Sequence, residues 1–276
     1  MEVEKKKVFI WVALIAIIAV LVFQILNNGK DEDVTIDKDF SHLNVESDNA
    51  DILLKPIEGD KALVELNQND NNRYRLDVGV KEETLEIEIE RKGFRWFSFN
   101  FFSKTPVVTV GLPSKEYGNI KAKTDNGTIK VSQVKAKEIV TDTDNGEINL
   151  DEVEGLKIFA ESDNGKITLK DIVSKDIFVE IDNGDAVIED SIGSIDGHSS
   201  NGKLTVITNR IEHPMDLETD NGQILVQTKD ESKNVQFNVK TDNGRVNIYG
   251  QSTDKEIGNG DIVIKLTSDN GNITVE

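Results

Sequence analysis

The sequence contains no cysteine, which excludes disulfide bonds, thiolate metal sites and cysteine catalysis. Histidine is scarce as well: the three copies, His42, His198 and His213, do not fall at a spacing from which two would ligate one metal ion. We therefore predict no metal site built on these side chains, and no cofactor. Proline occurs only four times in 276 residues, so most of the chain is free to pair as β-strands.

Basic residues are in clear deficit. The chain carries 32 Lys and Arg against 51 Asp and Glu, a formal net charge of −19. A surface of this sign repels nucleic-acid phosphate and anionic lipid and attracts cations and basic peptides, so we expect no nucleic-acid partner. The alternative interpretation is that the charge only keeps neighbouring molecules apart in solution.

Residues 8–26 form the one long apolar run, VFIWVALIAIIAVLVFQIL, in which Gln24 is the single polar residue. A helix of this length, at about 1.5 Å per residue, nearly matches a bilayer core of about 30 Å. Lys5, Lys6 and Lys7 precede the run, and the positive-inside rule then places the N-terminus in the cytoplasm. We predict a single-pass protein of the cell membrane with a basic flank (1–7), an anchor (8–26), a linker (27–33) and an extracytoplasmic β domain. A buried core helix is the alternative.

The most regular feature is a recurring Asn-Gly pair. The asparagines of this pair stand at positions 126, 145, 164, 183, 201, 221, 243, 259 and 270. The first five gaps are 19, 19, 19, 18 and 20 residues, and the later ones are 22, 16 and 11. A fixed period of this size is typical of stacked-repeat architectures, and the later drift indicates looser coils or inserted loops near the C-terminus.

Apolar residues alternate with polar ones on both sides of each pair. The second and fourth positions after the glycine are apolar in every copy, as in Ile148 with Leu150 and Ile167 with Leu169. A further apolar residue, Val134, Val153 or Ile172, recurs 19 residues apart and predicts a second corner. This period-two pattern predicts two short, half-buried strands in each unit.

Two all-β folds use such a pattern. Asn-Gly between alternating strands is a strong hairpin signal, so the units could form an antiparallel meander. Alternatively, each 19-residue unit is one coil of a parallel β-solenoid over residues 119–276, in which stacked asparagines form a ladder of amides and each glycine takes a left-handed conformation. The constant gaps favour the solenoid, because a stack tolerates less drift in length than a meander. The predicted structural corners are Asn126, Gly127, Asn145, Gly146, Asn164, Gly165, Asn183, Gly184, Asn201, Gly202, Asn221, Gly222, Asn243 and Gly244.

A calcium site is the rival interpretation of the Asp-Asn-Gly corners, because carboxylate, amide and carbonyl oxygens are the ligands that calcium prefers. The ligand spacing does not fit. The stretch DTDNGEINLDE at residues 142–152 is one residue short of an EF-hand loop before its glycine, and the paired glycines of calcium-binding nonapeptide repeats are absent. A calcium-responsive module therefore stays the alternative, not the first prediction.

Residues 34–118 are less regular. RYRLDVGVKEETLEIEIERKG, residues 73–93, predicts two strands joined at KEE, and residues 91–106 (RKGFRWFSFNFFSKTP) hold five of the 11 phenylalanines, four basic residues and no acid. One interpretation is a strand that caps the end of the core. The other, which we favour, is a contact site for a partner or the membrane, since both alternation faces are apolar. That predicted site comprises Phe94, Arg95, Trp96, Phe97, Phe99, Phe101 and Phe102.

The apolar N-terminal run, VESDNADILL at 45–54, VVTVGLP at 107–113 and the TDNGTIKV repeats together make the chain resemble a known family. It is similar to the putative-adhesin family of β-strand-repeat proteins of unknown function, and within it to LiaG-like bacterial envelope proteins. The resemblance implies a β-solenoid-like domain outside a bacterial membrane, with a link to envelope-stress signalling. It supplies no catalytic or ligand residues.

The residues themselves single out no catalytic centre. No Ser-His-Asp arrangement occurs at an informative spacing, and paired carboxylates carry little meaning in a chain with 51 acids. We predict that the protein is not an enzyme but a membrane-anchored binding or scaffold module. Its expected partner is another envelope protein or a cell-wall polymer.

Overall fold

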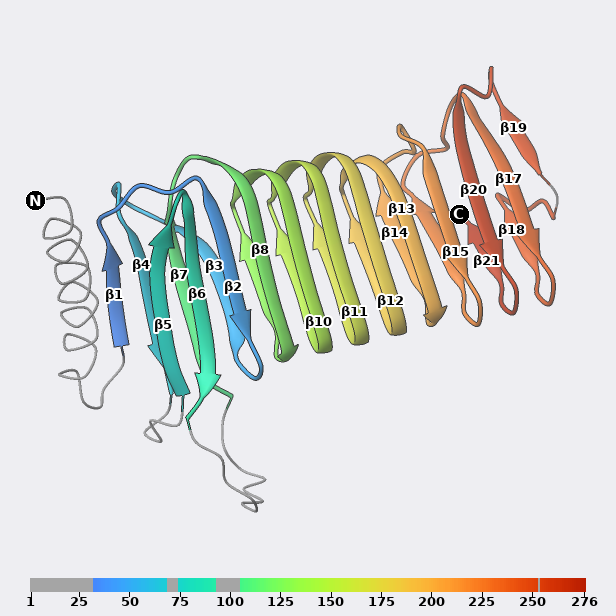
Figure 1. Ribbon diagram of the computed structural model, residues 1–276. Coiled ribbons are helices and arrows are strands. Elements are labelled where there is room, and N and C mark those ends of the chain that lie inside the picture. Colours follow the sequence, from blue (N-terminus) through green and yellow to red (C-terminus); the bar gives the residue numbers. More distant parts are fainter. Residues whose placement is uncertain (1–31, 69–73, 93–104, 253) are drawn as a thin grey trace, which may run out of the picture.

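The computed structural model describes residues 32–68, 74–92, 105–252 and 254–276, and every regular element in these ranges is a β-strand (Figure 1). The predicted all-β class is confirmed. No helix in the described ranges has the length and apolar character needed to cross a bilayer. The anchor predicted at residues 8–26 lies outside them.

Three long strands in the middle of the chain show how the 19-residue unit folds. They are β10 (Lys135–Asp151), β11 (Glu154–Lys170) and β12 (Val173–Glu189). Neighbouring strands run parallel, and each residue pairs with the residue 19 positions later, so that Asn145 lies beside Asn164 and Asn164 beside Asn183. One unit is therefore one coil, and like side chains lie on like side chains.

The remaining coils are each divided into two strands at the corner. Toward the N-terminal end of the stack they are, in spatial order, β6 (Thr84–Arg91) with β7 (Val107–Pro113), β2 (His42–Ser47) with β3 (Asp51–Ile57), and β8 (Glu116–Asn126) with β9 (Ile129–Ser132). Beyond β12 they are β13 (Ile192–Asn201) with β14 (Leu204–Thr208), β15 (Met215–Thr219) with β16 (Ile224–Thr228), β20 (Ile262–Ser268) with β21 (Ile273–Val275), and β17 (Val235–Thr241) with β18 (Val246–Ile248). Residues 42–113 thus contribute two coils to the same stack as residues 119–276.

The order of coils in space departs from the order in the chain at both ends (Figure 1). Near the N-terminus, β2 lies between β6 and β8. Near the C-terminus, β20 lies between β15 and β17. The chain therefore forms the outer coil with β17 first, and β20, which comes later in the sequence, forms the coil between β15 and β17. The irregular Asn-Gly gaps after position 201 have this cause, and not a loosening of the coils.

Both ends of the stack are covered by antiparallel strands. At one end β5 (Tyr74–Lys81) pairs with β6, β4 (Ala62–Asn67) with β7, and β1 (Glu32–Ile36) with β4. At the other end β19 (Lys255–Ile257) pairs with β17. The β5–β6 pair, joined around Glu82, confirms the two strands predicted on either side of KEE. Such caps occupy backbone groups that an open end would expose.

The core runs without interruption through the stack, because most inward positions of every coil are apolar. Next to the Asn-Gly corner the inward residues are often Thr or Ser, such as Thr143 and Ser162, and these are buried too. One inward row consists of Leu85, Leu43, Ile120, Ile139, Ile158, Ile177, Ile195, Met215, Ile264 and Phe237, all at most 5% exposed. β-Branched side chains suit this environment, since they pack well on a pleated surface. The outward positions form matching rows on the surface.

The second corner also follows the predicted spacing. Gln133, Glu152, Asp171 and Asp190 take left-handed backbone conformations, with φ between 45° and 54°. The next residue in the first three coils is Val134, Val153 or Ile172, and each of these is buried. These four left-handed residues therefore lie at the second corner, and none of them is a glycine.

Candidate functional site

The corner asparagines form a continuous ladder of amides along the stack. Each Nδ2 donates to the Oδ1 of the asparagine in the preceding coil, as in Asn164 to Asn145 at 3.2 Å. In spatial order the ladder comprises Asn49, Asn126, Asn145, Asn164, Asn183, Asn201, Asn221, Asn270 and Asn243, with steps of 3.0–3.2 Å. All steps point the same way, so the ladder fixes the register of each coil.

Glycine is required at the corners for a different reason from the predicted one. Of the predicted glycines from Gly127 to Gly244, Gly184 alone has a φ between +20° and +160°. A Cβ atom on Gly165 would instead lie 1.7 Å from the carbonyl oxygen of Gly146, and the other corners show similar distances. The prediction of a left-handed glycine was wrong: close approach of adjacent backbones excludes every larger residue here.

Among the Asn-Gly pairs in the described residues, Asn259-Gly260 does not belong to the ladder. Asn259 and Gly260 lie in the connection between β19 and β20, where the backbone N–H of Asn259 donates to Asn234 Oδ1 at 2.9 Å. Gly260 has a φ of 68°, so this turn does require the left-handed conformation. The sequence motif is the same, but its structural role differs.

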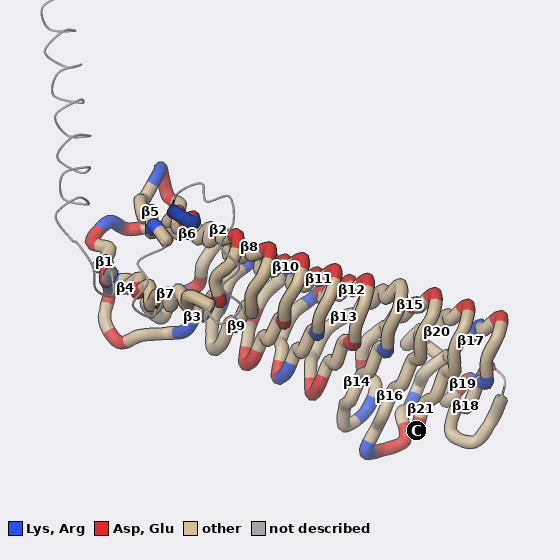
Figure 2. Tube along the Cα trace, turned by 90° about the horizontal axis from the view of Figure 1, so that it is seen from below, with Lys and Arg blue, Asp and Glu red and all other residues tan. Residues whose placement is uncertain are grey.

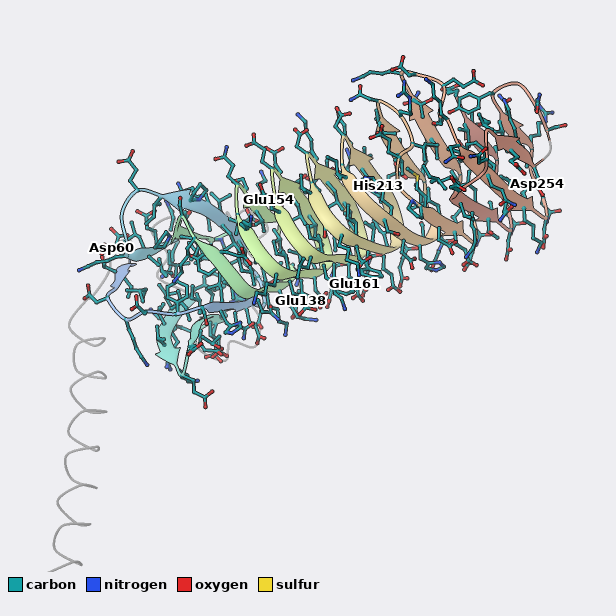
Figure 3. The ribbon with its side chains drawn as sticks, turned by 90° about the horizontal axis from the view of Figure 1, so that it is seen from above. Asp60, Glu138, Glu154, Glu161, His213 and Asp254 are labelled. Carbon is teal, nitrogen blue, oxygen red and sulfur yellow. The ribbon has the colours of Figure 1, made fainter. Side chains whose placement is uncertain are left out.

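The outer face of the central coils carries a set of rows that we call the acidic–aromatic face. It comprises Val140, Phe159 and Phe178 in one row, Asp142, Glu161 and Glu180 in a second, and Asp144, Asp163 and Asp182 beside the ladder. Period-two alternation turns these side chains outward. Acidic residues recur from coil to coil along the stack (Figure 2), and Glu138 and Glu161 project outward on the same side (Figure 3).

The two phenylalanines of this face are stacked and half-buried. The ring centroids of Phe159 and Phe178 are 4.5 Å apart and their planes differ by 8°. Each ring covers one face of the other, and together with Val140 in the same row they form an apolar strip beside the charged rows. Aromatic side chains in such a position are typical of contact surfaces.

The negative charges on this face are only partly neutralised. Burial raises the pKa of Glu161, the charges of Asp142, Glu180 and Asp163 raise it further, and Lys123 opposes them. Lys123 contacts Asp142 at 2.6 Å. Neighbouring coils lie about 4.8 Å apart, at which like charges in water repel by roughly 1 kcal/mol. A cationic group placed against the face would relieve this repulsion.

The structure thus brings the predicted corner residues together, whereas the aromatic-basic site at 94–102 lies outside the described residues. The acidic–aromatic face was missed in the sequence, although a signal was present. Phe159 and Phe178 are 19 residues apart and each directly follows an isoleucine of the inward row, Ile158 or Ile177. In the part of the chain that the structure describes, no group of three or more His, Asp or Glu is placed to hold a metal ion.

Comparisons with known proteins agree with this geometry. The Toastrack DUF4097 family matches residues 40–276. A structure from Bacteroides fragilis described as a putative adhesin is similar, with 14% identity, a TM-score of 0.55 and coverage of 90% of this chain and 98% of that one. A structure from Parabacteroides distasonis described as a putative lipid-binding protein has 18% identity, a TM-score of 0.50 and the same coverage. No curated protein matches. At these identities the solved structures support the fold alone, and the family match carries the assignment: the chain belongs to the Toastrack DUF4097 family.

Proposed function

We propose that the protein is a membrane-tethered β-solenoid that acts as a non-enzymatic binding or scaffold module of the bacterial cell envelope. The parallel, in-register stack of coils supports the solenoid assignment. The apolar run at 8–26 after Lys5, Lys6 and Lys7 supports a single-pass anchor with a cytoplasmic N-terminus and an extracytoplasmic β domain. The resemblance to LiaG-like proteins supports a place in the envelope-stress response.

The acidic–aromatic face is the observation that carries the binding role. A rigid stack holds Phe159 and Phe178 beside two rows of carboxylates, of which Asp142 is paired with Lys123 at the edge of the face. Charge complementarity then favours another envelope protein with a basic, partly apolar segment. The same charge disfavours anionic lipid, which argues against transferring the lipid-binding description of the Parabacteroides structure to this face.

Site-specific photo-crosslinking in the native membrane tests this proposal. A photoreactive residue at Phe159 is expected to capture one protein partner, whereas the same residue at Thr168, on the other side of the Asn-Gly corner in the same coil, should not. The double substitution Glu161→Lys and Glu180→Lys should abolish capture. Glu147→Lys with Asp151→Lys changes the net charge equally on the other side of the Asn-Gly corner and should leave capture intact. Identical adducts at both positions, or none at Phe159, would refute the proposal.

The aromatic-basic stretch remains a second proposed contact, for a partner or the membrane. Its sequence supports this role, since Phe94, Trp96 and Phe97 stand beside Arg95 in a chain of net charge −19. Replacing residues 94–102 by Gly and Ser should weaken attachment to the partner while the thermal unfolding of the β domain stays unchanged. A lower unfolding temperature would instead favour a core-capping strand.

Topology can be tested cleanly because the chain has no native cysteine. A single cysteine at Thr168 should react with a membrane-impermeant maleimide in intact cells, and one at Glu4 should react only after lysis. The opposite pattern would overturn the predicted orientation.

A further inference from the structure

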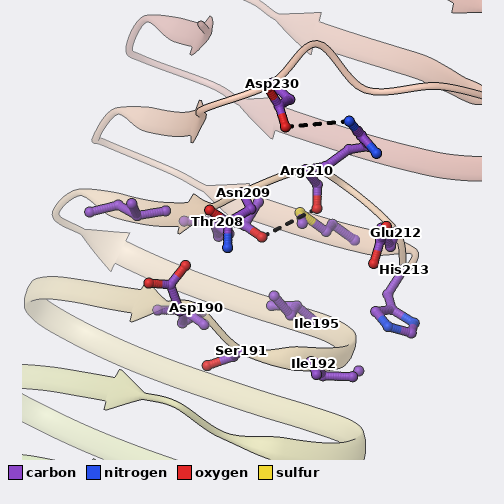
Figure 4. A pocket seen from close by; sticks show the side chains of 15 residues that line it. Asp190, Ser191, Ile192, Ile195, Thr208, Asn209, Arg210, Glu212, His213 and Asp230 are labelled. Atoms are coloured by element: carbon purple, nitrogen blue, oxygen red, sulfur yellow. Dashed lines mark hydrogen bonds and ion pairs between the residues drawn. The ribbon is translucent and has the colours of Figure 1, made fainter.

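A pocket of about 310 Å³ opens at the second corner that links β12 to β13 (Figure 4). We call it the corner pocket. The side chains of Ile188, Ile195, Val206 and Met215 belong to its lining and continue the apolar core. Its polar lining comes from Asp190, from Asp230 after β16, and from the segment between β14 and β15, which includes Arg210, Glu212 and His213.

A single residue explains why the pocket occurs in this coil. Val134, Val153 and Ile172 occupy the same place in three successive coils, and Ser191 is the fourth member of that series. The Ser191 hydroxyl donates to the carbonyl of Glu189 at 3.0 Å and so turns to the backbone instead of filling the core. Loss of a branched apolar side chain leaves space that packing would otherwise eliminate.

The corner pocket is not arranged for maximal stability. Asp190 Oδ1 and Arg210 Nε are both inaccessible and lack a hydrogen-bond partner within the described residues. An unsatisfied buried polar atom costs about 1–3 kcal/mol. Departures from the local rules of a fold concentrate where a protein binds something.

Electrostatics indicate the sign of the ligand. Asp190, Glu212 and Asp230 contribute three carboxylates to the lining, against one guanidinium. That guanidinium, on Arg210, is 3.3 Å from Asp230 (Figure 4), which leaves Asp190 and Glu212 without a cationic partner in the pocket. His213 is the remaining titratable group of the lining.

An exposed aliphatic strip leads to the pocket. Ile192, 52% exposed, lines it, and its register partner Val173 is 46% exposed. With Leu156 in the preceding coil, these are the large apolar side chains that the described part of the chain leaves most exposed. A chain of methylene groups lying along this strip would cover apolar surface that water now contacts.

We infer that the corner pocket binds a primary ammonium group carried on a short aliphatic chain. The ammonium meets Asp190 and Glu212, and the aliphatic stem lies against Ile192 and Met215. A lysine side chain and a free alkylamine share this chemistry. The site is separate from the acidic–aromatic face, so either can fail without the other.

Met215 gives the test a direct reporter, because the chain has only one other methionine, Met1. The full chain, labelled with ¹³C at the methionine methyl groups, is titrated with hexylammonium, 1-hexanol and hexanoate. Hexylammonium should shift the Met215 resonance and leave Met1 unmoved, while hexanol and hexanoate at equal concentration should not. An equal response to hexanol or hexanoate, or no response of Met215, would overturn the inference.

Two variants test separately whether binding depends on the open space of the pocket and on its negative charge. Ser191→Val restores the side chain of the other coils and should abolish the shift while unfolding at the same or a higher temperature. Asp190→Asn with Glu212→Gln leaves the pocket open and should weaken hexylammonium at least about tenfold, or about 1.4 kcal/mol. Thr168→Val, at a position outside the pocket lining, should bind as the native protein does. Unchanged affinity in the charge variant would contradict the role assigned to the carboxylates.

Titration with two short peptides shows whether the ammonium group comes from a lysine side chain or from a free amine. The peptide Gly-Gly-Lys-Gly-Gly, acetylated and amidated at its ends, should shift Met215 if the pocket takes a lysine side chain. The matching norleucine peptide should not. A response to hexylammonium alone would assign the pocket to small amines, and failure of both probes would overturn the inference.

Discussion

Replacing one corner glycine by alanine should destabilise the stack far more than an ordinary strand substitution. The Cβ atom of Gly165→Ala would lie 1.7 Å from the Gly146 carbonyl oxygen. A tolerable carbon–oxygen contact is about 3.3 Å, so the two coils must separate locally by about 1.6 Å. The φ angle of Gly165 lies outside the left-handed region, so the cost comes from this contact and not from backbone strain.

The magnitude follows from the bonds that such a separation breaks. Three or four hydrogen bonds join the two coils next to Gly165. They are the side-chain hydrogen bond from Asn164 to Asn145, the hydrogen bond from the Ser162 hydroxyl to the Gly146 carbonyl, and one or two backbone hydrogen bonds. At about 1 kcal/mol each, their loss amounts to about 3–4 kcal/mol. Equilibrium unfolding in urea, followed by circular dichroism, measures it.

Gly79→Ala is the matched control, because Gly79 lies in β5 and an added Cβ would meet no atom within 4 Å. Its effect should stay within about 1 kcal/mol of the native protein. Equal stabilities of the two variants would refute the steric explanation of the corner glycines.

The remaining predictions concern the ladder, the charged rows, the second corner and calcium. Asn164→Ala removes two hydrogen bonds of the ladder and should lower the free energy of unfolding, measured in urea, by about 1–2 kcal/mol. A loss below about 0.3 kcal/mol would show that the ladder does not stabilise the stack. Glu161→Gln should raise the melting temperature at pH 7. The pKa of Glu161 is raised from 4.5, so the stability that its protonation contributes is present below that value and is lost as pH rises through the folded-state pKa; the advantage of Gln over Glu should therefore vanish near pH 4. Glu152→Gly should be neutral or mildly stabilising in a melting assay, because Glu152 has a φ of 53°, and Glu152→Val should be clearly destabilising. Calcium at millimolar concentration should leave the melting temperature unchanged relative to chelator, and a rise would favour the calcium-responsive alternative.

The period of the fold could be predicted from sequence because it is local. Ile139, Ile158 and Ile177 repeat at the spacing of one coil, and their alternation with polar residues defines an inward face without knowledge of the partners. The glycine requirement could not be assigned correctly, since close approach to Gly146 depends on a neighbouring coil. A left-handed turn and a close contact between backbones both require glycine, so the sequence alone does not distinguish the two.

The exchange of coils at the two ends lay beyond sequence reasoning for a similar reason. Ile264 fits the inward row beside Met215 as well as Phe237 does, so alternation alone cannot order these coils. The corner pocket depends on a serine in one copy of a repeated apolar position, a signal that becomes meaningful only when Val134, Val153 and Ile172 are known to be buried. Asn259 shows the converse, a repeated motif without the repeated role.

Spin-label distances along one outward row test the central claim that coils stack in register in this spatial order. Asn149, Leu225, Thr274 and Asn247 occupy one row, with Leu225 four coils, Thr274 five and Asn247 six from Asn149. Single-cysteine pairs from position 149 to 225, 274 and 247 should give distances that increase in that order, about 19, 24 and 29 Å at about 4.8 Å per coil. A shorter distance to 247 than to 274, or steps that do not grow evenly, would contradict the account.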